Sequence, residues 1–158
     1  MDFKQFELVL DNLPEMTIGG KQFVPIFSYG SKADLLKWLR LKNKSKGKKY
    51  PLVWLETPLS SNRVSSYETA TINLVLATLT NANLSNRERT SLTFATTLDP
   101  LLENVLRAFK FSNQFRVIDG DANITKYFNY DSDEETGATD IWDAISFEIN
   151  IELNLNCI

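Results

Sequence analysis

The residues of this chain that could do chemistry are its carboxylates and lysines, because it contains no histidine and a single cysteine, Cys157. Without histidine, the chain lacks the commonest general base and the commonest transition-metal ligand. A Ser-His-Asp or Cys-His arrangement is therefore excluded within it. The lone cysteine leaves no intrachain disulfide and fits a reducing cytoplasm. Carboxylate chemistry on Mg²⁺, as in some nucleases, stays open.

Two acidic segments have the residue types of a calcium-binding loop but not its spacing. Asp131, Asp133 and Glu135 match the first ligands of such a loop. Its sharp turn requires glycine at the sixth position, but Gly137 is seventh, and Trp142 replaces the bidentate glutamate at the twelfth. The second segment lacks the glycine as well and comprises Asp119, Asp121, Asn123 and Ile124. We expect solvated loops here, with no metal site and no cofactor.

Two oppositely charged loops are the main candidates for a binding role. The predicted basic loop contains Lys42, Lys44, Lys46, Lys48 and Lys49. The predicted acidic loop contains Asp131, Asp133, Glu134, Glu135, Asp140 and Asp143. Each can simply be solvated, and the basic loop can also attract phosphate, although no interleaved aromatic residue suggests base stacking. In a ring of identical subunits, the two loops could instead meet across a heterologous interface.

The remaining distinctive side chains leave their roles open. Trp38, Trp54 and Trp142 are most simply core or interface aromatics. Arg87 and Arg89 can pair with carboxylates or lie at a subunit contact, and the sequence does not decide between these roles.

Composition sets the broad class of protein. A chain of 158 residues, 43% hydrophobic and 23% charged, suits a single domain over residues 1–158 with its own core. No apolar run is long enough to span a bilayer, and the N-terminus lacks the pattern of a secretory signal. The net charge of −3 argues against a general nucleic-acid binder.

Helix signals recur along the chain. Asp2 with Gln5, and Ser85 with Glu88, form capping-box patterns, and Ser31 precedes a third helical segment. Apolar residues then recur at helical spacing. A further helix is predicted to start at Asp99, with Pro100 at its first position. Arg107 and Lys110 suit its C-terminal end because they complement the helix dipole.

Strand signals alternate with these helices. Residues 23–29 predict a strand at the edge of a sheet or with a bulge, because Pro25 lacks an N–H. Residues 50–57 predict a central strand, because the middle of this segment is fully apolar. A Pro- and Ser-rich connection at 58–66 leads into a long strand. The other predicted strands span residues 67–80, 115–118, 124–130 and 145–155, and the buried face of the longest comprises Ala70, Ile72, Leu74 and Leu76.

The C-terminal strand has the clearest pattern of all. Every second residue from Ile145 to Leu155 is apolar, and polar residues alternate with them. Side chains alternate across a strand, so one face is buried and the other is wet. We therefore expect an α+β fold with an antiparallel or mixed sheet, two or three helices packed on one face, and long projecting loops.

Three segments together resemble a known family. They are YPLVWLETP at 50–58, TINLVLAT at 71–78, and the stretch from NRxR at 86–89 through Phe94 to LxPLL at 98–102. They are similar to small neck proteins of Bacteroidota-infecting tailed phages, including crAss-like phages. Those proteins are related in architecture to tail-completion, tail-terminator and head–tail connector proteins. The resemblance spans about residues 50–155 and does not extend to the two charged loops.

The resemblance implies a structural role and transfers no catalytic residue. Copies of the chain would form a ring at the portal–tail junction around the DNA channel, with about twelve copies expected rather than six. The implied partners are the portal, other neck or tail proteins, and packaged DNA through non-specific contact. The implied locations are the virion, and the host cytoplasm during assembly, with no membrane.

Two other classes of function are compatible with the residues. One is a Mg²⁺-dependent nuclease that uses carboxylates and a lysine. The other is a small non-catalytic regulatory binding module. We favour the structural protein, and we expect that the chain is not an enzyme.

Overall fold

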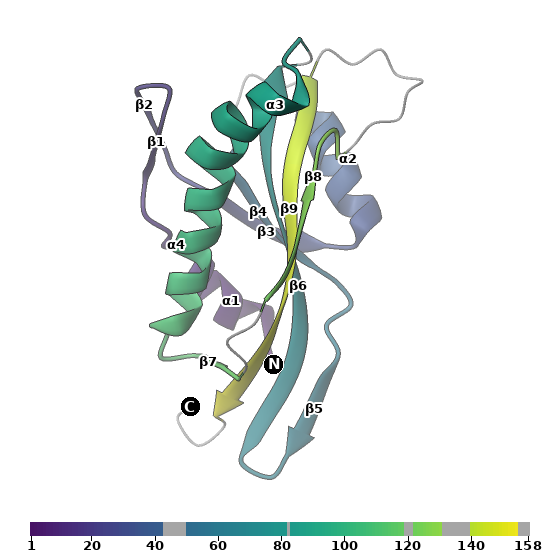
Figure 1. Ribbon diagram of the computed structural model, residues 1–158. Helices are drawn as coiled ribbons and strands as arrows, with labels where there is room; N and C mark the ends of the chain where they lie inside the picture. Colours follow the sequence, from purple (N-terminus) through teal and green to yellow (C-terminus); the bar gives the residue numbers. More distant parts are fainter. Residues whose placement is uncertain (43–49, 82, 119–121, 131–139, 155–158) are drawn as a thin grey trace.

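Fourteen elements follow one another along the chain, and the computed structural model describes residues 1–42, 50–81, 83–118, 122–130 and 140–154 (Figure 1). The helical elements are α1 (Phe3–Leu10), α2 (Lys32–Lys42), α3 (Asn86–Arg89), the π-helical segment η1 (Thr90–Leu98) and α4 (Asp99–Lys110). The strands are β1 (Met16–Ile18), β2 (Lys21–Phe23), β3 (Ile26–Gly30), β4 (Leu52–Glu56), β5 (Ser61–Val64), β6 (Tyr67–Asn81), β7 (Arg116–Val117), β8 (Asn123–Tyr127) and β9 (Asp140–Asn154).

Two long antiparallel strands, β6 and β9, form the centre of the main sheet. Each has 15 residues, and they pair in continuous register from Tyr67 opposite Asn154 to Asn81 opposite Asp140. Shorter strands flank this pair on both sides. Strands β4 and β5 pair with different halves of β6, and β8 and β7 pair with different halves of β9.

The edge position predicted for the strand with Pro25 is confirmed for β3. This strand lies at one end of the main sheet and is parallel to β4, while the other pairings are antiparallel. The strand begins after Pro25, so the missing N–H costs the sheet no hydrogen bond. The prediction of an α+β fold with a mixed sheet is confirmed.

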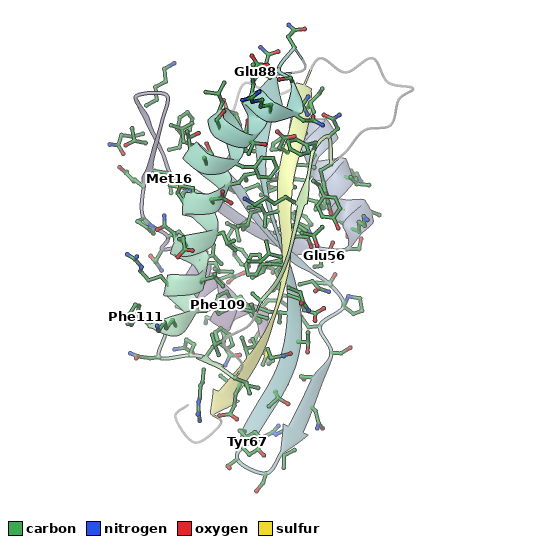
Figure 2. All side chains as sticks on the ribbon, viewed as in Figure 1. Met16, Glu56, Tyr67, Glu88, Phe109 and Phe111 are labelled. Atoms are coloured by element: carbon green, nitrogen blue, oxygen red, sulfur yellow. The ribbon has the colours of Figure 1, made fainter. Side chains whose placement is uncertain are left out.

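One face of the main sheet packs against α1, η1 and α4. The alternating residues predicted to be buried on the two long strands point to this face as far as Leu153, with Ile72 and Phe147 among them, and Leu155 lies outside the described residues. Phe109 points from α4 toward the sheet (Figure 2). The ring of Phe6 from α1 contacts the ring of Phe109, and their centroids lie 6.4 Å apart. The prediction of two or three helices packed on one face is therefore confirmed.

The opposite face is also covered at one end, so the expectation of a sheet with one wet face is wrong there. Leu35 and Leu39 of α2 pack on this face, against Trp54, Val75 and Trp142. The crossover from β3 to the parallel strand β4 passes through α2 and brings the helix back over the sheet. Further along β9, side chains such as Glu148 on this face are exposed, as predicted.

The local start signals of three helices are confirmed. Asp2 with Gln5 and Ser85 with Glu88 both form complete capping boxes. At α2, the Ser31 hydroxyl accepts a hydrogen bond from the Asp34 N–H, with 3.2 Å between the two atoms. Each of these contacts joins residues three apart, and the sequence alone therefore specifies them.

The helix predicted to start at Asp99 is confirmed as α4, but the prediction that Asp99 caps a separate helix is wrong. Residues 86–110 form one continuous helix, and Asp99 has helical backbone angles within it. Its N–H donates to the Phe94 carbonyl, five residues back. Threonine hydroxyls in η1 bond to preceding carbonyls, as Thr90 does to Asn86 at 2.9 Å. This wider π-helical register accommodates Pro100, which would clash in a regular helix interior.

Two short hairpins were not predicted from the sequence, one formed by β1 with β2 and one by β5 with β6. Gly19 and Gly20 have positive φ values of 56° and 78° and turn the hairpin of β1 and β2. The segment expected to be a plain connection at 58–66 contains β5, which forms a hairpin with β6. This β5–β6 hairpin projects past the helices at the lower end of the molecule (Figure 1). Within the described residues, no helix is both long and apolar enough to cross a membrane.

Candidate functional site

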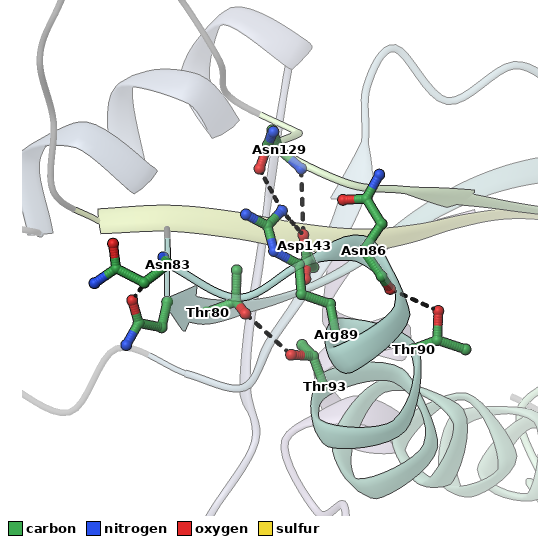
Figure 3. Close-up of polar contacts among 9 residues, drawn as sticks. Thr80, Asn83, Asn86, Arg89, Thr90, Thr93, Asn129 and Asp143 are labelled. Atoms are coloured by element: carbon green, nitrogen blue, oxygen red, sulfur yellow. Dashed lines mark hydrogen bonds and ion pairs between the residues drawn. The ribbon is translucent and has the colours of Figure 1, made fainter.

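A buried charge pair lies at the upper end of the helix-covered sheet face. Arg89 is the last residue of α3 and is 3% exposed. Asp143 lies on β9, two residues before Ile145, so its side chain points to the same face and is fully buried. The Arg89 Nη1 donates to Asp143 Oδ1 with 3.3 Å between the atoms (Figure 3).

Asn129 joins this pair and connects a third segment to it. The Arg89 Nη1 donates to Asn129 Oδ1, and the Asn129 backbone N–H donates to Asp143 Oδ1 at 3.2 Å. Asn129 has a φ of 57°, a left-handed conformation that asparagine adopts more readily than most residues. The cluster therefore ties α3, β9 and the segment that follows β8 to one another.

The burial and hydrogen bonds of this Arg89–Asp143–Asn129 cluster indicate that it holds the fold together. Burial raises the pKa of Asp143, and the Asn129 N–H and the Arg89 guanidinium oppose that rise. Arg89 Nε and Asp143 Oδ2 have no hydrogen-bond partner among the described residues. Beside them, the Thr80 and Thr93 hydroxyls lie 3.0 Å apart (Figure 3). A buried carboxylate held by arginine is a poor general base, because a reacting proton cannot reach it.

Of the five lysines in the predicted basic loop, only Lys42 belongs to the residues that the structure describes. Lys42 is the last residue of α2, so it ends a helix and does not belong to a loop. The helical pattern that starts at Ser31 simply continues to this residue. The other four lysines of the predicted loop lie outside the described residues: Lys44, Lys46, Lys48 and Lys49.

The prediction of an acidic loop is wrong at its C-terminal end. Asp140 and Asp143 belong to β9, which starts five residues earlier than the alternation from Ile145 indicates. Pairing with β6 extends the strand, and the Arg89 guanidinium offsets part of the cost of burying Asp143. The other members of the predicted loop lie outside the described residues: Asp131, Asp133, Glu134 and Glu135.

The described residues offer no constellation for metal binding. Among them, no group of three or more carboxylate, histidine or cysteine side chains converges. Most of the two calcium-like segments falls outside the described ranges, where the failed spacing remains a prediction. Grooves of about 450, 520 and 340 Å³ lie on the surface, and none of these three is lined by Arg89 or Asp143.

The projecting β5–β6 hairpin is the other distinctive feature. All four residues of β5 are exposed, and Val64 and Tyr67, which face each other next to the turn, are 43% and 39% exposed. Glu68, which follows Tyr67 on β6 and pairs with Arg63 of β5, accepts hydrogen bonds from the Met1 amino group at 2.6 Å and from the Ser61 hydroxyl. These two bonds lower the pKa of Glu68. Met1 therefore anchors the hairpin one residue from its exposed apolar pair.

Comparison with known proteins adds no family to this description. No protein-family model matches the chain. No curated protein matches it either. What points to a function is therefore the resemblance of residues 50–155 and the geometry of the fold.

Sequence reasoning left the role of Arg89 open and misassigned Asp143. The two residues are 54 positions apart, and no local pattern connects them. A signal was nevertheless present in β9, because Asp143 continues backward the alternation that begins at Ile145. A carboxylate at a position that should be buried predicts a cationic partner.

Proposed function

We propose that this chain is a structural subunit of a tailed-phage neck and assembles into a ring around the DNA channel between portal and tail. The resemblance in residues 50–155 supports this role. That range supplies the central strands β4, β6 and β9 and the long helix, so it covers the scaffold of the fold. The partners would be further copies of the chain, the portal and other neck or tail proteins.

The geometric observation that carries the proposal is the β5–β6 hairpin. It extends past the helices, and Val64 and Tyr67 next to its turn are apolar and exposed. Exposed apolar side chains on a projecting arm favour contact with a neighbouring molecule. An arm that contacts a different surface of the next copy gives a heterologous interface, which closes into a ring when the rotation allows it.

The charged segments supply the second part of the proposal. The lysines between Lys42 and Lys49 would face either the packaged DNA or the acidic segment of a neighbour. Exposed ion pairs contribute about 0–1 kcal/mol each and weaken with salt, so they steer assembly more than they set its affinity. The protein would lie in the virion neck, and in the host cytoplasm during assembly.

Assembly of the purified chain tests the proposal. We expect native mass spectrometry and negative-stain electron microscopy to show rings, with about twelve copies rather than six. Replacing Val64 and Tyr67 by serine should abolish rings and leave the circular dichroism spectrum unchanged. The matched control is Val24→Ser, because Val24 is also an exposed valine, at 51%, but lies outside the hairpin.

Two results would contradict the proposal. One is a chain that forms no ring either alone or when its phage's portal complex is added. The other is a ring that the hairpin variant still forms with the same copy number. The first result would favour the small regulatory module, for which a monomer or dimer is expected. The second would mean that the hairpin does not carry the ring contact.

A further inference from the structure

A second apolar surface lies where α1 and the end of α4 meet. Phe111, which follows α4, is 73% exposed, and Leu8 of α1 is 56% exposed. Phe109, two residues earlier, is fully buried against the sheet (Figure 2). Phe111 is the most exposed large apolar side chain in the described ranges. Such exposure on a helix face marks a contact surface.

Phe111 forms a ridge between two grooves. One groove, of about 340 Å³, is lined by Leu8, Val9, Ala108 and Phe111 together with polar residues at 112–114. The other, of about 520 Å³, is lined by Phe111 and by four residues of α4: Glu103, Leu106, Arg107 and Lys110. A ridge beside a groove is a shape that a self-complementary contact can use.

On this α1–α4 face, the order of charges along α1 is the reverse of the order along α4. Lys4 and Asp11 lie seven residues apart along α1 and its C-terminal cap, and Glu103 and Lys110 lie seven residues apart on α4. Seven residues of helix span about 10.5 Å, so both pairs have the same spacing. Their order is opposite, cation first on α1 and anion first on α4. None of the four forms an ion pair with another described residue.

We propose that this face binds a second copy of the chain in a two-fold symmetric contact. The α1 of one copy lies alongside the α4 of the other, so that Lys4 meets Glu103 and Asp11 meets Lys110. Phe111 of each copy enters the groove beside Leu8 of its partner. Apolar burial supplies the affinity, and the charges fix the register. Because a two-fold contact closes at two copies, it is separate from the proposed ring contact of the hairpin.

Charge reversal and rescue test this arrangement on the full chain by sedimentation equilibrium. In the background with serine at 64 and 67, which removes the proposed ring contact, we expect a dimer, and a dissociation constant raised roughly tenfold or more by Phe111→Ser or by Lys110→Glu. The double variant with Asp11→Lys and Lys110→Glu should recover the dimer, because the pair is restored with reversed signs. Matched controls are Leu92→Ser, whose side chain is 57% exposed, and Lys37→Glu on α2; both should dimerise normally.

Three outcomes would overturn the inference. They are a chain with serine at 64 and 67 that stays monomeric at all concentrations, a dimer that Lys110→Glu leaves intact, and a double variant that is no better than its single parents. Circular dichroism of each variant separates loss of contact from loss of folding. The hairpin variant with serine at 64 and 67 should still dimerise, so failure of the proposed ring and failure of this contact are distinguishable.

Discussion

Arg89 and Asp143 are the residues whose environment departs furthest from that of an ordinary surface charge. Both are almost completely removed from water, and each has one polar atom without a partner among the described residues. A buried pair of this kind contributes little net stability compared with apolar residues of the same size. Removal of one member is different, because it leaves the other charge buried and uncompensated.

We therefore expect Asp143→Asn to lower the free energy of unfolding by about 3–5 kcal/mol, since it leaves the Arg89 guanidinium without its carboxylate. Replacing both residues, with Arg89→Met and Asp143→Leu, should cost much less than Asp143→Asn alone. Urea unfolding of the parent and these variants measures the effect. Equal and additive losses in single and double variants would contradict the view that the two charges depend on each other.

At the same scale, the carboxylates of the chain are expected to do no hydrolytic chemistry. Purified protein with Mg²⁺ or Mn²⁺ should leave single- and double-stranded DNA intact, as measured by gel electrophoresis. The physical reason is the absence of histidine together with the wrong spacing of both calcium-like segments. Cleavage that a single Asp or Glu substitution abolishes would support the nuclease alternative.

At the scale of elements, β9 determines whether the sheet exists. Its C-terminal part buries Ile151 and Leu153 and pairs with β7. Burial of each such side chain is worth about 1.5–3 kcal/mol, against a domain stability on the order of 5–15 kcal/mol. Deleting residues from Asn150 onward should therefore prevent cooperative thermal unfolding in calorimetry. Glu148→Ala, on the exposed face of the same strand, is the control and should melt near the parent temperature.

The capping box of Ser85 and Glu88 at the start of α3 predicts how the stability of the protein depends on pH. Hydrogen bonds from Ser85 lower the pKa of Glu88 below its usual 4.5. A carboxylate whose pKa is lowered by folding stabilises the protein above its unfolded pKa, and this contribution is lost as the pH falls through the folded pKa. Glu88→Gln should therefore flatten the fall in melting temperature below pH 4.5. Ser85→Ala should lower stability at pH 7 by about 0.5–2 kcal/mol.

At the scale of the whole molecule, charge is expected to guide assembly. Replacing Lys44, Lys46 and Lys48 by glutamate should leave the fold intact, because these lysines lie between α2 and β4 in the sequence and are not part of either element. Ring formation or DNA retention should decline, most visibly at low salt, where electrostatic attraction is least screened. Particles that assemble and hold DNA as well as the parent would indicate that the segment is only a solvated surface.

The sequence by itself determined the features that depend on near neighbours. The capping boxes at Asp2 and Ser85 link residues three apart, and the alternation in β6 and β9 requires only that one face be buried. The edge position of β3 followed from Pro25, because a missing N–H disfavours a central strand. These are local rules, and the α+β class follows from them.

Only the tertiary structure decided the features that join distant residues. Asp143 is a strand residue because Arg89, 54 positions away, holds its carboxylate inside the fold. The helix continues through Asp99 because η1 adopts a π-helical register ahead of the proline, which the pattern of apolar residues does not reveal. The second face of the sheet is covered because a parallel crossover returns α2 over it. Each of these outcomes depends on which surfaces meet in space, and spacing along the chain does not encode that.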